Sequence, residues 1–342
     1  MDNLTHTLTA IALSHAGLRR KTRFATLTLF AASNLPDLDI VSGFWGNATY
    51  LKYHRGITHS FLGISLLAFL LALAVYFLGG KAKPKPGPPL SLRWLLILAW
   101  LGTATHLLMD YTNAYGIRPF LPFSGRWYAW DVMPIVDPWL LVLLGIGLGL
   151  PALLRLVSEE VGARKTRPAW GGVLALSAMA CLWGLHDVAH RRVLGLLQAH
   201  TYSEQDPVRV GAFPSPVNPF AWTGVVETDS AYALLPANAL ASDVDPQSAL
   251  QFHKPEESPP LDTAMKTRTG RIFMDFARFP WARVDENEEG FEVEIRDLRF
   301  SSTYGGGFVM VVEMDKALRV LSESFSFGGP RVGRSRSGAV EE

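Results

Sequence analysis

The chain has 342 residues, of which 49% are hydrophobic and 18% are charged, and its mean hydropathy is +0.16. This composition is too apolar and too poor in charge for an ordinary soluble protein, so it indicates a membrane protein with a soluble part. A net charge of +1 without basic clusters argues against a nucleic-acid partner, and the single Cys181 excludes a disulfide framework or a Cys-ligated metal site within one chain.

Six apolar segments predict helices, and the first two are short. Residues 3–18 and residues 24–36 carry no charged side chain, but each is shorter than the roughly 20 residues that cross a membrane. They can tilt, pair as a re-entrant hairpin, or extend into the interface. Four longer helices are predicted at residues 57–79, 93–110, 133–155 and 169–187. Residues 1–190 are therefore expected to form an α-helical polytopic membrane domain of about six helices.

The basic residues are distributed unevenly between the loops on the two sides of these helices. Four Lys or Arg occur in each of the loops 19–23, 81–93 and 155–168. Two occur in each of the loops 37–56 and 110–132. By the positive-inside rule, the first set of loops is cytoplasmic. The N-terminus, the second set of loops and everything after residue 187 are then expected outside the cytoplasm.

The pattern changes after about residue 190 to alternating apolar and polar residues with turn-forming residues between them. Strands are predicted at residues 221–228, 270–279, 291–300 and 306–314. Residues 191–328 are expected to form a small β-rich domain outside the membrane. The tail, residues 329–342, is rich in Gly, Arg and Ser and is expected to be disordered.

Two histidines lie directly before the longest apolar run, although ionisable groups are costly at a membrane. They are His54 and His59 in the sequence His-Arg-Gly-Ile-Thr-His. Gly56 lets the backbone turn, so both rings can converge on one point, and neutral imidazoles are good zinc ligands. Alternatively, Thr58 caps the following helix and the histidines are merely interfacial.

Two further pairs fall on the same predicted face of the membrane. His106 and Asp110 are four residues apart and lie on one side of a helix. They can bind one metal, the carboxylate can orient the ring, or the two can form a structural pair. Asp37 and Asp39 alternate on a segment after a proline, and paired carboxylates suit a divalent cation or a general base. Such a pair can also belong to a solvated loop.

Four other residues join this set because of their position. His6 alone is typical of a core histidine, but it falls on the same face. Asp131 and Asp137 flank the start of the fifth predicted helix, where they could act as late ligands or bases, and Asp131 could equally be a helix cap. Arg55 could pair with an anionic group, since guanidinium matches phosphate oxygens, or it could be a plain interfacial arginine.

Ordered motifs along residues 1–190 resemble the YdjM-like family of bacterial inner-membrane proteins, described as membrane-bound metal-dependent hydrolases related to zinc-dependent phospholipase C. The motifs that carry the resemblance are Asp2-Asn3-Leu4-Thr5-His6, Asn34-Leu35-Pro36-Asp37-Leu38-Asp39, His54-Arg55-Gly56-Ile57-Thr58-His59-Ser60, His106-Leu107-Leu108-Met109-Asp110, Tyr115-Gly116, Pro122-Phe123-Ser124 and residues 131–138. The resemblance implies a helical, membrane-embedded metal site and a hydrolase activity, without a substrate.

The sequence therefore predicts a metal-dependent hydrolase of the bacterial plasma membrane, with zinc as the expected ion. The expected metal ligands are His6, Asp37, Asp39, His54, His59, His106 and Asp110. The residues expected to serve catalysis are Asp39, Arg55, Asp131 and Asp137. A metal-activated water would attack a phosphoester or ester of a membrane lipid or lipid-linked substrate. The alternatives are a membrane transporter, a non-catalytic metal-binding scaffold, and an inactive relative whose β domain binds a protein partner that the sequence does not identify.

Overall fold

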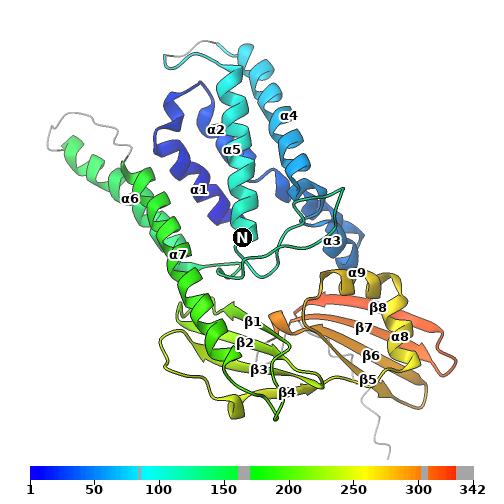
Figure 1. Cartoon of the computed structure of the whole chain (residues 1–342). Coiled ribbons are helices and arrows are strands. Elements are labelled where there is room, and N and C mark those ends of the chain that lie inside the picture. Colours follow the sequence, from blue (N-terminus) through cyan, green and yellow to red (C-terminus); the bar gives the residue numbers. More distant parts are fainter. Residues whose placement is uncertain (84–85, 161–169, 302–306, 329–342) are drawn as a thin grey trace, which may run out of the picture.

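The computed structural model describes residues 1–83, 86–160, 170–301 and 307–328, with the backbone alone for residues 155–160. It contains a helical domain and a domain of strands and short helices, which lies against one end of the helices (Figure 1). The predicted fold class, a helical membrane domain followed by a β-rich domain, is confirmed. The tail predicted to be disordered, residues 329–342, lies outside the described residues.

All six predicted helices are present, with shifted ends. They are α1 (Asn3–His15), α2 (Ala25–Ala32), α4 (Phe61–Gly80), α5 (Leu92–Tyr111), α6 (Pro138–Glu160) and α7 (Trp170–Gln198). Serine side chains cap two of them, because Ser60 accepts a hydrogen bond from an early amide of α4 and Ser91 does so for α5. Helix α4 starts later than predicted because η3 (Ile57–His59) forms a separate 3-10 turn.

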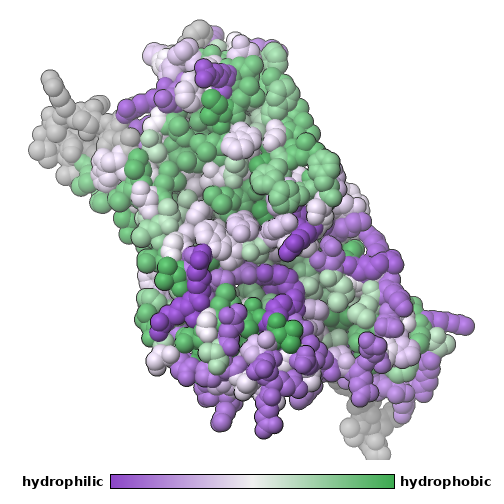
Figure 2. All heavy atoms as spheres, in the orientation of Figure 1, coloured by the Kyte–Doolittle hydropathy of each residue, from purple (hydrophilic) through white to green (hydrophobic). Residues whose placement is uncertain are grey.

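The surface of the helical domain is suited to a membrane. Helices α4, α5 and α7 are long and apolar enough to cross one by length and composition, and α6 contains a shorter apolar stretch, Pro138–Leu154. On the face drawn in Figure 2, apolar side chains predominate along the helical domain, whereas most of the hydrophilic side chains lie on the C-terminal domain. An apolar surface of this extent is costly in water, so the helical domain is the part placed in the membrane.

The two short helices pack inside the bundle. Helix α1 lies against α6 and α7, and helix α2 lies against α5. Two glycines permit these close approaches. A Cβ atom added to Gly172 on α7 would lie 2.4 Å from the carbonyl oxygen of Ala12, and one added to Gly102 on α5 would lie 2.6 Å from the Cβ atom of Ala32. The end of α1 is thereby held beside α7, and the end of α2 is held beside α5.

The predicted loop between α2 and α4 consists mainly of short helices. These are η2 (Pro36–Trp45), α3 (Asn47–Tyr53) and η3. Proline fits the first turn of η2, since it has no amide hydrogen to satisfy. Several apolar side chains of η2 are exposed, namely Leu38, Ile40, Val41, Phe44 and Trp45. Exposed aromatic and aliphatic side chains of this kind suit a membrane interface.

The first sheet of the C-terminal domain is antiparallel, with its four strands in chain order. The strands are β1 (Arg209–Pro214), β2 (Ala221–Glu227), β3 (Ala231–Asn238) and β4 (Leu250–His253). Helix α7 continues beyond its predicted end and packs Val193 and Leu197 against Trp222 of this sheet. The predicted domain boundary at residue 190 therefore lies within a continuous helix that joins the two domains.

The second sheet is also antiparallel and in chain order. Its strands are β5 (Pro280–Glu286), β6 (Gly290–Asp297), β7 (Phe308–Asp315) and β8 (Val320–Phe327). Helices α8 (Pro259–Lys266) and α9 (Arg268–Phe276) cover one face of it (Figure 1). Phe273 and Phe276 pack into the same core as Ile295 and Met310, which are paired across β6 and β7.

The structure confirms three predicted strands and corrects the fourth. Residues 221–228, 291–300 and 306–314 overlap β2, β6 and β7, within the part that is described. The predicted strand at 270–279 is wrong, because most of it is helix α9. Thr269, Phe273 and Phe276 are spaced to share one helix face and all three are buried. The Thr267 side chain caps the helix by accepting a hydrogen bond from the Gly270 amide.

Candidate metal centre

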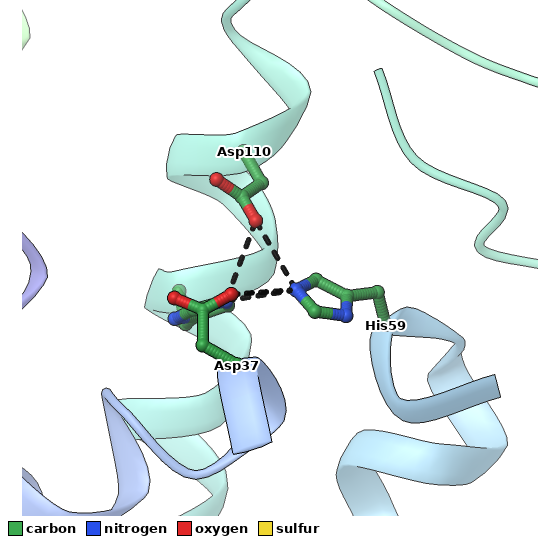
Figure 3. A group of neighbouring side chains, drawn as sticks. Asp37, His59 and Asp110 are labelled. Atoms are coloured by element: carbon green, nitrogen blue, oxygen red, sulfur yellow. Dashed lines mark hydrogen bonds and ion pairs between the residues drawn. The ribbon is translucent and has the colours of Figure 1, made fainter. Parts of the chain in front are cut away.

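Four side chains from three elements meet at the end of the helical bundle. Asp37 comes from η2, His59 from η3, and His106 and Asp110 from α5, and all four are buried. Figure 3 shows the labelled side chains of Asp37, His59 and Asp110 pointing toward one another. One ligand atom from each of the four residues lies within 4.8 Å of those of the other three. We refer to these four residues as the quartet.

The distances within the quartet match a tetrahedral ligand set. The Nε2 atoms of His59 and His106 are 3.0 Å apart, and Asp110 Oδ2 lies 3.2 and 3.3 Å from them. Asp37 Oδ1 lies 3.4 Å from His59 Nε2 and 3.6 Å from His106 Nε2. Four ligands bound to zinc at 2.0–2.1 Å in a tetrahedron are separated by about 3.3–3.4 Å. The quartet residues therefore fit a zinc-sized divalent cation with little rearrangement.

The second ring nitrogen of each quartet histidine has its own partner. Nδ1 of His106 lies 2.8 Å from the carbonyl oxygen of Ser33, which can only accept a hydrogen bond. Nδ1 of His59 lies 3.2 Å from Asp39 Oδ2. Such partners fix the ring orientation and direct Nε2 to a metal. Both Nε2 atoms are thus held facing the same point between the carboxylates.

Asp39 organises the segment that carries the two predicted histidines. Its Oδ1 lies 2.7 Å from Nδ1 of His54, and its Oδ2 accepts hydrogen bonds from the Arg55 amide at 3.0 Å and the Thr58 hydroxyl at 2.6 Å. Burial by itself would raise the pKa of Asp39, but the bonds to His54 and His59 lower it. Asp39 is therefore a carboxylate at neutral pH. Asp37, Asp39 and His54 also form a second group that could hold a metal ion.

His6 lies beside the quartet without a hydrogen-bond partner. Its ring stacks on that of His106 with 3.9 Å between ring centroids, and its Nε2 is 3.5 Å from Asp110 Oδ1. Both ring nitrogens of His6 and Oδ2 of Asp110 are buried without a hydrogen bond in the described structure. Buried polar atoms without partners are costly. These atoms thus support a bound cation or water at this place.

The charges of the quartet are mutually dependent. Burial alone would lower the pKa of His59, but its close contacts with the carboxylates of Asp110, Asp37 and Asp39 outweigh burial and raise the pKa to about 10. Burial alone would raise the pKa of Asp37, but the hydrogen bond from His59 and the positive charge of His106 lower it to about 2. In the absence of metal, His59 therefore carries a proton that balances the carboxylates.

Arg55 holds the Asp110 carboxylate through a buried ion pair. Its Nη2 lies 2.9 Å from Asp110 Oδ1, and its Nη1 donates to Asn113 Oδ1 at 2.9 Å and to the Gly116 carbonyl at 3.2 Å. The amino group of Met1 also contacts Asp110. Arg55 is almost fully buried. These contacts favour a positioning role, in which Arg55 holds the charge and direction of the Asp110 carboxylate.

Two predicted residues lie apart from the quartet. Asp131 forms a bidentate ion pair with Arg278 of the C-terminal domain, at 2.9 and 2.6 Å. Asp137 caps α6, with its Oδ1 accepting a hydrogen bond from the Leu140 amide at 2.7 Å. Both therefore have structural partners, and their predicted roles as late ligands or bases remain predictions.

A cavity of about 540 Å³ adjoins the quartet at the junction of the two domains. Asp37, His54 and Arg55 line its polar part. Its apolar part includes Tyr50 and Tyr115 and, from the C-terminal domain, Phe308 and Phe327. Sequence reasoning named Tyr115 only as part of a family motif and did not identify the other three aromatic residues, since isolated aromatic residues give no signal of a shared cavity. The arrangement can admit a ligand with an apolar portion beside the carboxylates and imidazoles.

Comparisons with known proteins cover most of the chain. The family model described as YdjM inner membrane protein matches residues 1–192, which include the quartet, and the YfhP C-terminal alpha/beta plait domain matches residues 259–327. The chain is 24% identical over 337 residues to a protein of Bacillus subtilis (strain 168) named "Uncharacterized protein YfhP", with 94% of each chain covered. No solved structure matches the chain.

Proposed function

The chain belongs to the YdjM inner membrane protein family, and we propose that it is a membrane-embedded hydrolase that depends on a divalent metal, with zinc as the expected ion. The observation that carries the proposal is that five of the six separations among the four quartet atoms, at 3.0–3.6 Å, are close to those of a tetrahedral ligand set. His6, Asp39 and His54 are the remaining candidates for ligation, because they adjoin the quartet.

The residues of the chain divide into those that would hold the ion and those that would support them. His59, His106, Asp37 and Asp110 would bind it, Asp39 and the Ser33 carbonyl would orient the two imidazoles, and Arg55 would hold Asp110. A divalent ion at this place would lower the pKa of a bound water and polarise an ester or phosphoryl oxygen, with the water taking a coordination position in addition to the four residues or in place of one of them. The burial of the quartet excludes bulk water, which strengthens its electrostatic effect on a reacting group.

A lipid-linked phosphoester or ester is the substrate class that we propose. The cavity beside the quartet combines polar groups with Tyr50, Tyr115, Phe308 and Phe327. Ile40 of η2 lines it too, and η2 exposes further apolar side chains that suit a membrane interface. A lipid could therefore present its headgroup to the quartet while its apolar part stays near the bilayer. We propose, from the basic loops, that this end of the bundle is extracytoplasmic.

The test is turnover by purified protein that is stripped with EDTA and then reloaded with zinc. We would measure hydrolysis of a panel of phospholipids and of water-soluble nitrophenyl phosphate and acetate. We expect turnover only after reloading, and none by a variant with His59→Ala and His106→Ala. His253→Ala is the matched control, because His253 is exposed on β4. Normal turnover by the double variant would contradict the proposal, and metal flux in proteoliposomes without hydrolysis would favour a transporter.

A further inference from the structure

A second pocket, of about 330 Å³, lies where α9 of the C-terminal domain meets α3 of the helical domain. Its lining includes Lys52, Arg118, Arg268 and Arg271, with Asp275 as its acidic member. In the described structure this pocket shares no lining residue with the cavity beside the quartet. The surplus of positive charge indicates an anionic ligand.

Arg118 gives this pocket a fixed, buried cation. Its side chain is 10% exposed, and its guanidinium stacks over the Trp127 ring with 4.5 Å to the ring centroid. Nη2 donates to the carbonyl oxygen of Lys52, and Nη1 lies 3.5 Å from Asp275 Oδ2. The remaining donor, Nε, is buried without a hydrogen-bond partner in the described part of the chain. A buried guanidinium with an unused donor is poised to bind an additional acceptor.

The other cations of the pocket are exposed and have no ion-pair partner among the described residues. Within the described ranges, no carboxylate lies within ion-pair distance of Lys52, Arg268 or Arg271. Arg268 donates a hydrogen bond to the Thr49 hydroxyl at 3.3 Å. Burial alone would raise the pKa of Glu323, but hydrogen bonds from Thr269 and Thr267 and the charge of Arg268 lower it overall. The pocket therefore keeps a net positive charge that an incoming anion could neutralise.

An apolar groove of about 370 Å³ borders the same chain segment. Ile117, Pro119 and Phe120 line the groove, whereas Arg118 between them lines the basic pocket. Apart from Tyr128, the rest of the groove is formed by α4 and α5, two of the helices suited to cross a membrane, and includes Phe61, Trp100 and Ala104. A groove on this surface faces lipid chains, so an acyl chain is the natural occupant.

We propose that the basic pocket and the apolar groove together bind one anionic phospholipid. Its phosphate would lie among Arg118, Arg268 and Arg271, and one of its acyl chains would lie in the groove between α4 and α5. Guanidinium groups match phosphate oxygens in geometry and charge, and basic pockets beside membrane helices suit lipid headgroups. The site is distinct from the metal centre, and it would stabilise the junction of α3 and α9 when a lipid is bound.

Native mass spectrometry of the full chain in detergent tests this proposal, with dioleoyl phosphatidylglycerol and dioleoyl phosphatidylcholine as probes. We expect the first phosphatidylglycerol molecule to bind at least roughly tenfold more tightly than phosphatidylcholine, since charge-assisted hydrogen bonds are strong. Arg268→Ala with Arg271→Ala should abolish this preference. Lys316→Ala with Arg319→Ala removes the same charge from an exposed turn of the same domain and should preserve it.

A second variant separates a lipid from free phosphate as the ligand. Ala104→Phe would fill the groove, so it should weaken phosphatidylglycerol binding without affecting the metal content of the protein. The proposal is overturned if both lipids bind equally, or if Lys316→Ala with Arg319→Ala weakens binding as much as the pocket variant. The proposal is also overturned if a low concentration of inorganic phosphate displaces the lipid and Ala104→Phe leaves lipid binding unchanged. That pair of results would identify a site for phosphate alone. None of these readouts depends on hydrolysis.

Discussion

Nε2 of His59 lies 3.0 Å from Nε2 of His106, although the two residues are 47 positions apart in the chain. Each ring uses Nδ1 for a different acceptor, the Asp39 carboxylate for His59 and the Ser33 carbonyl for His106. Two imidazole nitrogens that face each other at this distance need a proton or a metal cation between them. A proton on His59 supplies it in the absence of metal, and a divalent cation would replace that proton.

Asp39→Asn should weaken metal binding without abolishing it. Asp39 contacts His54, Arg55, Thr58 and His59, so we expect it to orient ligands. Loss of such a supporting carboxylate typically lowers metal affinity by about 10–100-fold. Competition with a chelating dye would measure the affinity, with Asp187→Asn as the control. Loss of binding as complete as in Asp37→Asn would instead make Asp39 a direct ligand, as the sequence predicts.

Arg55→Gln should destabilise the metal-free protein strongly. The variant leaves the buried Asp110 carboxylate without its guanidinium partner, and breaking a buried ion pair costs about 3–5 kcal/mol. The free energy of unfolding in mild detergent would measure this. Arg191→Gln is the matched control, because Arg191 is 75% exposed in its pair with Asp187 and should lose less than about 1 kcal/mol. Equal losses in the two variants would argue against a positioning role for Arg55.

Asp131 and Arg278 should be coupled energetically across the domain junction. Their side chains are 14% and 29% exposed, and the pair is bidentate. A double-mutant cycle with Asp131→Ala and Arg278→Ala should give a coupling of about 1–3 kcal/mol in the free energy of unfolding. Metal content should be unchanged in Asp131→Ala. A loss of metal in that variant would support the predicted role of Asp131 as a late ligand.

Acid should weaken the first sheet partly through Glu227. Burial alone would raise the pKa of this carboxyl, but Lys254 at 2.9 Å and Arg209 at 2.6 Å lower it overall. A lowered pKa in the folded state means that the carboxylate stabilises the fold above the ordinary glutamate pKa. This contribution is lost as pH falls through the lowered value. Thermal unfolding from about pH 5 to pH 3 should therefore show a steeper loss for the wild type than for Glu227→Gln. Equal losses of thermal stability in the wild type and in Glu227→Gln would contradict this prediction.

The sequence predicted the membrane helices well because their apolar runs are long, and it placed His59, His106, Asp37 and Asp110 at one end of them. The sequence could not show that Asp131 lies apart from these residues. The position of a residue at a helix end predicts its depth in the membrane, but it does not predict which side of the bundle the side chain faces. Strand β3 was missed because both of its faces are buried, so it shows no alternation. Helix α9 was mistaken for a strand because its segment is short and rich in aromatic and β-branched residues, which are also typical of strands.

Metal analysis of the purified protein tests the central claim most directly. After exposure to zinc and extensive dialysis, the wild type should retain at least one divalent ion per chain, as should His253→Ala. The folded variant with His59→Ala and His106→Ala should retain none at the quartet and should therefore hold one ion fewer. A wild type that retains no metal, or a double variant with the metal content of the wild type, would contradict the assignment of the quartet as a metal centre.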